Sequence, residues 1–223
     1  MQCSATGGTP TGDAQLSTFF SGVSAEDGCE PVPTITNNGP TVFPVGLTPV
    51  NFTATDAGSL ANSCSANVRV IDTIQPNITC PAPNAVECTA TGGTPASNPT
   101  ITGFLGDATA TDVCDPSLPI TNNAPGFFNL GATPVQFRTV DNSLNSAMCS
   151  NTVSVVDTTP PIIGSLTANP NSLWPPNHTL VPISLTVSLS DVCDTNAASC
   201  QIVSVSSNQP INGTATAIPL PTG

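Results

Sequence analysis

The chain has 223 residues, of which 14 are acidic and two are basic, so its formal net charge at pH 7 is −12. Charged side chains make up only 7% of the sequence, against roughly 25% in an ordinary soluble domain. Two arginines cannot provide the basic surface that nucleic-acid binding requires, and the same shortage argues against attraction to an anionic membrane. No run of about 18 apolar residues occurs, so the sequence predicts no transmembrane helix.

Cysteine usage indicates an oxidising compartment. Nine cysteines stand in a chain that contains no lysine, and such a composition favours an extracellular location over the cytosol. The first residues, Met1-Gln2-Cys3, do not begin a secretory signal with a basic start and an apolar centre. We therefore interpret the chain as a mature segment of a secreted protein.

An internal repeat organises the chain. A shift of 85 positions superimposes three cysteines of the first copy on three of the second, namely Cys3, Cys29 and Cys64 on Cys88, Cys114 and Cys149. The same shift aligns the pentapeptide Thr-Gly-Gly-Thr-Pro at residues 6–10 with its copy at residues 91–95. A period of this length corresponds to a domain rather than to one turn of a solenoid.

The predicted elements of each repeat are short β-strands. In the first copy, residues 49–55 alternate apolar and polar side chains, and residues 66–70 do so again after a polar turn. The second copy has the same pattern at residues 134–140 and 152–156. Each pair predicts a hairpin with one buried face. About seven short strands per repeat are typical of a β-sandwich.

A third segment follows Pro160-Pro161 and departs from the 85-residue register. Residues 180–189 alternate as a strand, and Asp191-Val192-Cys193-Asp194 repeats residues 112–115 of the second copy. No counterpart of the closing hairpin appears, so we expect this domain to be incomplete. The counterpart of Cys80 would fall before Met1, so the first repeat is expected to lack its first strand. The predicted domains are residues 1–73, 74–158 and 159–223.

The combined pattern resembles the hyalin repeat (HYR) domain. It runs from an Asp-x-Cys motif through Phe43-Pro44-Val45-Gly46 and a Thr-Ala-Thr-Asp strand end to a last strand that closes at Val-x-Asp-Thr. The second repeat, about residues 75–159, carries the full-length match, although Phe128-Asn129-Leu130-Gly131 replaces the proline of the turn. Residues 173–178 resemble a module that follows such repeats in bacterial secreted proteins. The resemblance implies immunoglobulin-like sandwiches in an extracellular, adhesive or structural protein.

The resemblance also implies a disulfide pattern. In the second repeat Cys80 would pair with Cys149 and Cys88 with Cys114, although four cysteines allow three connectivities. Transferred by the repeat, Cys3 would pair with Cys29, which leaves Cys64 unpaired or bonded to another chain. Cys193 and Cys200 would pair locally. Sulfur ligation of a metal is disfavoured, because the sequence contains no Cys-x-x-Cys.

Acidic residues gather at predicted turns and suggest a calcium site in each repeat. Pairs of acids flank cysteines and single aspartates end strands, and both loops lie at one end of an immunoglobulin-like sandwich. Carboxylate oxygens suit Ca²⁺. The candidate ligands are Asp112, Asp115 and Asp141 in the second repeat and Asp27, Glu30 and Asp56 in the first. The competing interpretation is that these acids form Asx turns and keep the protein soluble.

Catalytic residues are scarce. His178 is the sole imidazole, and the chain has neither tyrosine nor lysine, so general acid–base and nucleophilic catalysis have few candidates. Trp174, before two prolines, is a better domain-edge anchor than a sugar platform. The sequon Asn-x-Ser/Thr, which bears on function only in a source that glycosylates, occurs at Asn51, Asn77, Asn177 and Asn212.

The sequence thus predicts an all-β protein of tandem immunoglobulin-like β-sandwich domains, the first and third of them incomplete. The expected function is that of a non-enzymatic extracellular structural or adhesive module, a semi-rigid rod whose proline-containing linkers limit bending. Its partners would be proteins, including other copies that complete it by strand donation into a surface filament. The alternatives are a carbohydrate-binding or accessory module of a secreted hydrolase and a calcium-dependent adhesion module.

Overall fold

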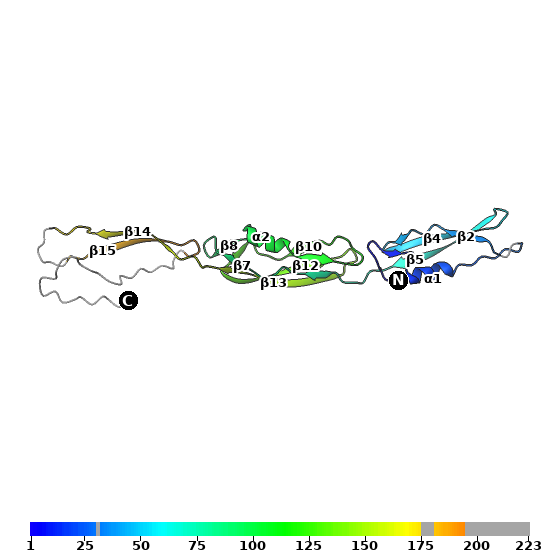
Figure 1. Ribbon diagram of the computed structural model, residues 1–223, viewed down its shortest axis with the longest axis horizontal. Helices are drawn as coiled ribbons and strands as arrows, with labels where there is room; N and C mark the ends of the chain where they lie inside the picture. Colours follow the sequence, from blue (N-terminus) through cyan, green and yellow to red (C-terminus); the bar gives the residue numbers. More distant parts are fainter. Residues whose placement is uncertain (30–31, 175–180, 195–223) are drawn as a thin grey trace. The chain divides into compact units, whose positions relative to one another are not determined.

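A computed structural model of the chain describes residues 1–29, 32–174 and 181–194. The chain divides into two compact units, Met1–Thr158 and Thr159–Gly223. The first unit contains both 85-residue repeats, and most of its elements are labelled in Figure 1. No helix in the described part is long and apolar enough to cross a membrane.

The first repeat is built mainly from antiparallel strands around a short helix. Strands β2, β4 and β5 form one sheet in that order, and β1 pairs with β3. The bounds are β1 Thr9–Pro10, α1 Ala14–Ser21, β2 Thr34–Asn37, β3 Val42–Phe43, β4 Gly46–Thr55 and β5 Ala61–Val70.

The second repeat has the same elements and three more strands. Its main sheet has the order β10-β12-β13-β7, while β11 pairs with β8 and β6 pairs with β9. The bounds are β6 Asn77–Thr79, β7 Asn84–Glu87, β8 Gly93–Pro95, α2 Pro99–Gly106, β9 Thr109–Thr111, β10 Ile120–Asn122, β11 Phe127–Asn129, β12 Gly131–Val140 and β13 Ser146–Val156.

The all-β class predicted from the sequence is confirmed, and the two closing hairpins occupy the predicted places. Strands β4 and β5 pair antiparallel from Gly46 opposite Val70, and β12 and β13 pair in the same register from Gly131 opposite Val155. Both hairpins are longer than predicted, because polar residues at their distal ends continue the pairing after the apolar alternation has stopped.

Each repeat buries the same set of side chains. Buried positions alternate with exposed ones over residues 134–139 of β12, and Val153 and Val155 of β13 are buried on either side of a half-buried Ser154, as expected for a sheet with one buried face. Equivalent positions of the two repeats fill the two cores. These are Leu16, Phe43, Val50, Phe52, Val68 and Val70 in the first and Ile101, Phe128, Val135, Phe137, Val153 and Val155 in the second, all buried.

One short helix in each repeat was not predicted. Helix α1 begins after Asp13, whose side chain accepts a hydrogen bond from the Gln15 amide, and α2 begins after Asn98 with Pro99 in its first turn. Both caps satisfy amides that the helix leaves without a partner. Each helix is only eight residues long. Two turns are too few for the helical spacing of apolar residues to be recognised in the sequence.

The repeated Thr-Gly-Gly-Thr-Pro motif is explained by a close approach of two backbones. An added Cβ at Gly93 would lie 2.1 Å from the carbonyl oxygen of Phe128, and one at Gly8 would lie 1.9 Å from that of Phe43. The preceding glycines, Gly7 and Gly92, have φ of 81° and 75°, which favours glycine. The motif therefore lets β1 and β8 pack against β3 and β11.

In the third segment the described residues form one antiparallel pair. Strand β14, Ile162–Asn169, pairs with β15, Ser184–Ser190. The sequence predicted a strand over residues 180–189, and the observed one begins later and ends at Ser190. Residues 175–180 and 195–223 lie outside the described part, so the predicted incompleteness of this domain stays a prediction.

Candidate functional sites at the repeat junction and beside Cys64

A disulfide joins the two repeats. Cys3 of the first repeat is bonded to Cys114 of the second, 111 residues away in sequence, with their Cα atoms 6.1 Å apart. Both residues are buried, at 1% and 4% exposure. The neighbouring backbone is held as well, since the Gly7 amide donates to the Cys114 carbonyl at 2.8 Å. The segment after Cys3 and the loop at Cys114 therefore form a direct contact between repeats.

This bond corrects the expected pairing. The resemblance implied Cys3–Cys29 and Cys88–Cys114, but both are wrong because Cys114 is bonded to Cys3 and Cys29 is an exposed free thiol. A disulfide requires Cα atoms within about 7 Å, and that distance is met across the junction. Reasoning one repeat at a time could not find a bond whose partners belong to different copies.

The remaining cysteines fall into three groups. Cys80 is bonded to Cys149, which is the pairing that the resemblance implies for the first and last strands of the repeat. Cys88 and Cys193 are also disulfide-bonded, while Cys200 lies outside the described residues. Cys64 is exposed and free.

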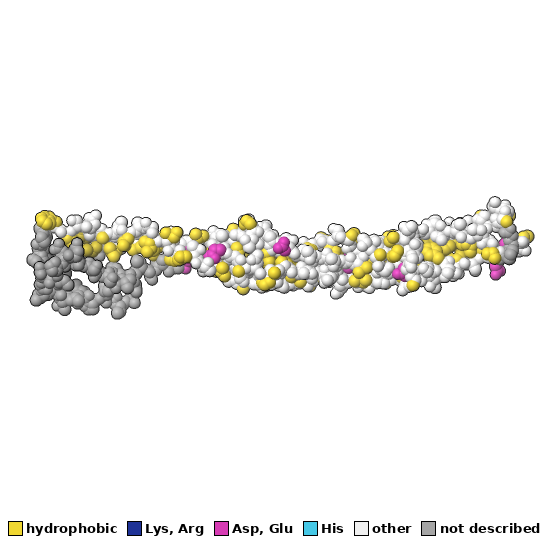
Figure 2. Space-filling view, in the orientation of Figure 1, with side chains coloured by type: hydrophobic (Ala, Val, Ile, Leu, Met, Phe, Trp, Pro, Cys, Tyr) yellow, Lys and Arg dark blue, Asp and Glu magenta, His cyan; other side chains and the backbone are white. Residues whose placement is uncertain are grey.

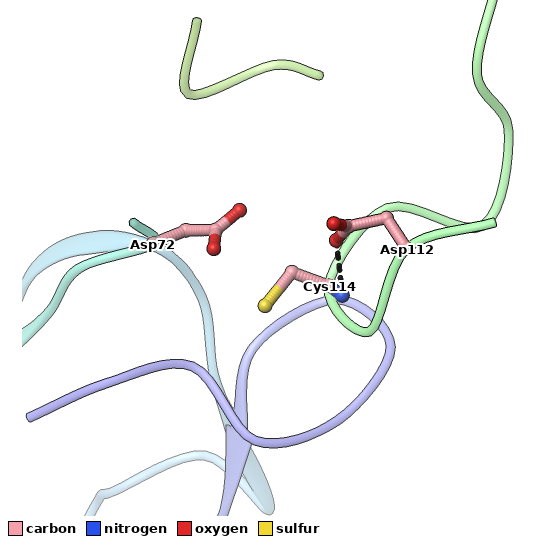
Figure 3. A group of neighbouring side chains, drawn as sticks. All are labelled: Asp72, Asp112 and Cys114. Atoms are coloured by element: carbon pink, nitrogen blue, oxygen red, sulfur yellow. Dashed lines mark hydrogen bonds between the residues drawn. The ribbon is translucent and has the colours of Figure 1, made fainter. Parts of the chain in front are cut away.

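Four aspartates converge beside the inter-repeat disulfide. Asp72 follows β5 of the first repeat, whereas the other three come from loops of the second. Carboxylate oxygens of Asp72, Asp115 and Asp141 lie within 4.8 Å of one another, and Asp72 meets the same criterion with Asp112 and the Cys114 sulfur. Figure 3 shows the carboxylates of Asp72 and Asp112 pointing toward each other above Cys114. Because that sulfur is in a disulfide, it is not a thiolate ligand, and the cluster is one of oxygens.

Hydrogen bonds fix the orientation of each carboxylate. Asp112 Oδ1 accepts from the amides of Cys114 at 2.7 Å and Asp115 at 3.2 Å. Asp141 Oδ1 accepts from the amides of residues 143 and 145 at 2.9 and 2.7 Å. Asp72 Oδ1 accepts from the Ile74 amide at 3.1 Å and from Gln2 Nε2 at 3.3 Å.

Two asparagines complete the junction. Asn145 Nδ2 donates to Asp141 Oδ2 at 2.8 Å and to the backbone carbonyl of Asp72 at 3.3 Å. Asn142 donates to Asp115 through its amide, at 3.1 Å, and through its side chain. Asn145 thus connects the second repeat to the end of the first.

The predicted calcium ligands have different outcomes. The structure places Asp112, Asp115 and Asp141 of the second repeat around a residue that the sequence did not single out, Asp72. In the sequence Asp72 lies in the predicted linker between the repeats. Its equivalence to Asp157 did not indicate which residues of the second repeat would lie beside it.

The matching set of the first repeat is not assembled in the described part of the chain. Asp27 accepts from the Cys29 amide at 2.7 Å, as in an Asx turn, and Asp56 accepts from the Leu60 amide, four residues on, at 2.8 Å. These two carboxylates belong to no metal-sized cluster among the described residues. Glu30 lies outside the described residues.

A second feature is an open groove on the first repeat. A pocket of about 260 Å³ is lined by residues 23–26, by Ile35, Phe52 and Ala54, and by residues 62–64, so that Cys64 lies in its wall. Figure 2 shows apolar side chains exposed in a row over this repeat, in the region that Figure 1 labels β2 and β4. In the second repeat the equivalent position is covered by β6, which pairs with β9 and carries the chain to Cys80.

The other candidate residues contribute no assembled site. Trp174 is 85% exposed and stands without an aromatic neighbour among the described residues. The sequon residues Asn51 and Asn77 are exposed at β4 and β6. His178, Asn177 and Asn212 lie outside the described residues.

Sequence comparisons agree with the architecture. The HYR domain family matches residues 71–155. Hyalin of Lytechinus variegatus is 36% identical over 160 residues, which cover 68% of this chain and 29% of that protein. Hyalin of Strongylocentrotus purpuratus is 38% identical over 132 residues, 56% of this chain and 11% of that protein. The chain therefore spans less than a third of the length of either relative.

Among solved structures, a protocadherin gammaB7 EC3-6 cis-dimer matches with 14% identity and a TM-score of 0.29, over 71% of this chain and 52% of that one. The family match spans the second repeat from Ile71 to Val155, and the first repeat shares five of its strands, its helix, its core positions and its motif. This chain contains an HYR domain, at residues 71–155.

Proposed function

We propose that this chain is a non-enzymatic spacing module of an extracellular structural or adhesive protein, in which the first two repeats are locked together at their junction. The observation that carries the proposal is the Cys3–Cys114 disulfide. Structural disulfides persist in oxidising environments and are rare in the cytosol, which supports an extracellular location.

The junction supports a spacing role because several contacts restrict bending at one point. The disulfide, the Gly7 amide on the Cys114 carbonyl and Asn145 on the Asp72 carbonyl all cross from one repeat to the other. A linker between independent domains would leave relative motion as the default. Repeats locked in this way can hold a binding surface or a neighbouring subunit at a fixed spacing, and proteins are the proposed partners.

The tumbling of the two repeats tests this proposal. Nitrogen-15 relaxation of the full chain gives a rotational correlation time for each repeat. We expect equal values in the native chain and separate, shorter values in the double variant Cys3→Ser, Cys114→Ser. The matched control is Cys80→Ser, Cys149→Ser, which removes a disulfide within one repeat. Independent tumbling in the native chain would contradict the locked junction, and unchanged tumbling in the first variant would contradict the disulfide as the contact that locks it.

A second candidate function is strand acceptance at the Cys64 groove. The second repeat shows what such a strand does: β6 pairs with β9, contributes a half-buried Ile78 and ends next to Cys80, which is bonded to Cys149. In the first repeat residues 24–26, equivalent to β9, are not in a strand, and the counterpart of Cys149 is the free Cys64.

The proposed occupant is an extended segment of the same chemistry as residues 77–80, with an apolar side chain two positions before a cysteine. Main-chain hydrogen bonds to the edge at residues 24–26 and a disulfide to Cys64 would complete the sandwich, as in other cases of strand addition. Such a segment can precede residue 1 in the same polypeptide or come from a second chain, and the second source would join copies into a filament.

A synthetic peptide with the sequence of residues 75–81 tests the groove. After incubation in a glutathione redox buffer, peptide mapping should find the peptide on Cys64 at least tenfold more often than on Cys29, the other exposed free thiol among the described residues. The control peptide carries aspartate at the Ile78 position and keeps its cysteine. Equal labelling of both thiols, or equal reaction of the control peptide, would exclude a strand-specific groove. Non-reducing mass spectrometry of native material distinguishes an upstream segment from a second chain.

A further inference from the structure

We propose that the junction between the two repeats binds Ca²⁺, with Asp72 of the first repeat and Asp112, Asp115 and Asp141 of the second as carboxylate ligands. The proposal is independent of the disulfide-locked spacing role, since either can hold without the other. It places the ion between repeats, with a ligand from each side.

The spacing of the oxygens fits one ion. Calcium binds oxygens at about 2.4 Å, so two oxygens on opposite sides of the same ion lie no more than about 4.8 Å apart. The carboxylates of Asp72, Asp115 and Asp141 meet that limit, as does the pair of Asp72 and Asp112. Asp72 is the residue that the two groups share, one with Asp112 and the other with Asp115 and Asp141.

Buried oxygens without a donor point into the cluster. Asp72 is 7% exposed, and its Oδ2 accepts no hydrogen bond; Asp112 Oδ2 is buried and has no donor either. Burying a carboxylate oxygen without a partner is costly. The Oδ1 atoms of both residues are held by backbone amides, so the two Oδ2 atoms are the ones left for a ligand (Figure 3).

The charge of the cluster requires a cation. Among the described residues, the hydrogen-bond donors to the four carboxylates are backbone amides and Asn or Gln side chains, and none is an arginine. Carboxylates at this separation repel strongly when partly buried. A bound divalent cation would neutralise two of the four charges and supply the missing partner of both Oδ2 atoms.

The donor set selects the ion. All four ligands are hard carboxylate oxygens, and the nearby sulfur is unavailable because it is in a disulfide. Zinc and copper favour nitrogen and sulfur ligands. Magnesium demands near-ideal octahedral geometry, whereas calcium accepts six to eight oxygens in irregular arrangements. Calcium therefore fits a site whose ligands come from three separate loops.

The Asx-turn interpretation of these acids accounts for part of the cluster only. Asp112 makes an Asx-type bond to the Cys114 amide, as Asp191 does to the Cys193 amide. Such turns need one carboxylate oxygen and leave the second free to face solvent. They do not explain why the second oxygens of Asp72 and Asp112 are buried without a hydrogen-bond donor.

The test is calorimetric titration of the full, disulfide-intact chain with CaCl₂ after removal of metal by EDTA, together with thermal unfolding. We expect binding heat and a rise in the melting temperature with calcium. The variant Asp72→Asn should bind at least tenfold more weakly. The control Asp107→Asn removes the same charge at an exposed position outside the cluster and should bind like the native chain.

The same variant separates a cation site from a purely structural role. An asparagine at position 72 keeps the acceptor for the Ile74 amide and places an NH₂ group opposite Asp112 Oδ2. Without calcium, Asp72→Asn should therefore melt at a higher temperature than the native chain, and calcium should no longer raise it. Absence of calcium heat in the native chain, or native affinity in Asp72→Asn, would overturn the proposal.

Discussion

Cys3 and Cys114 are bonded to each other although they occupy different positions of different repeats. In the 85-residue register, Cys3 is equivalent to Cys88 and Cys114 to Cys29. The bond is therefore heterologous: it joins the start of one repeat to the Asp-x-Cys loop of the next. A connection of this kind can link repeats in series while leaving each sandwich unchanged.

Removing this bond should lower the free energy of unfolding of the first unit. Cross-linking residues 111 apart constrains the unfolded chain, and losing such a link typically costs about 2–5 kcal/mol. The measurement is urea unfolding of Cys3→Ser, Cys114→Ser against the native chain, followed by circular dichroism.

The second disulfide is a useful comparison. Cys80–Cys149 spans 69 residues, and the logarithmic dependence on loop length predicts a difference of only about 0.4 kcal/mol between the two. Similar losses are therefore expected, with the Cys80–Cys149 variant altering the second repeat alone. A loss below about 0.5 kcal/mol for Cys3→Ser, Cys114→Ser would show that the junction is already held by its other contacts.

The close backbone approach at Gly93 gives a second prediction. Gly93→Ala would place a Cβ 2.1 Å from the Phe128 carbonyl oxygen, so β8 must move away from β11. We expect a destabilisation of at least about 3 kcal/mol, in the range of severe strain. The matched control is Gly103→Ala, where an added Cβ meets nothing within 4 Å in helix α2.

Helix propensity favours alanine over glycine by about 1 kcal/mol, so Gly103→Ala should stabilise the second repeat. Opposite signs for the same chemical change would show that the glycine of the repeated motif is required by packing. If both variants behave alike in thermal unfolding, the contact between β8 and β11 is looser than the structure indicates.

The sequence predicted those features that recur within one repeat. Alternation at Val50 and Phe52 identified β4, and the identical pattern at Val135 and Phe137 identified β12. In a half-buried strand apolar and polar residues alternate over a few consecutive positions, so the pattern can be recognised in a short segment. The all-β class followed from those strands. The predicted functions follow less directly from the sequence, because they depend on contacts between the repeats and with partner proteins.

What the sequence could not supply were contacts between copies. The 85-residue shift compares Cys3 with Cys88 but contains nothing about which cysteine of another copy lies beside it. Asp72 was hidden for the same reason: it ends a strand of one repeat and meets carboxylates of the next. The helices had a local signal, an Asn or Asp cap followed by apolar residues three apart, but it was too short to outweigh the prolines and glycines around it.

Core packing in the second repeat gives a third prediction. Phe137 is completely buried on β12, and its ring centroid lies 5.7 Å from that of Phe104 in helix α2. Phe137→Ala should cost about 3–5 kcal/mol. The neighbouring strand offers a control in Met148→Ala, because Met148 is 57% exposed and should lose less than about 0.5 kcal/mol. Comparable losses in chemical denaturation would mean that the core does not lie between α2 and the sheet.

The final prediction concerns Asn145, whose side chain donates to Asp141 Oδ2 within its own repeat and to the Asp72 carbonyl of the other. Asn145→Ala leaves two acceptors without this donor, and a loss of about 1–3 kcal/mol is expected. The control is Asn142→Ala, because the Asn142 side chain donates to Asp115 within the second repeat. Hydrogen exchange distinguishes the two, since the Ile74 amide, bonded to Asp72 Oδ1, should exchange faster in Asn145→Ala only. Equal exchange at Ile74 in both variants would show that Asn145 does not couple the repeats. Of the contacts that support the locked junction, the disulfide and the Gly7 amide would then remain.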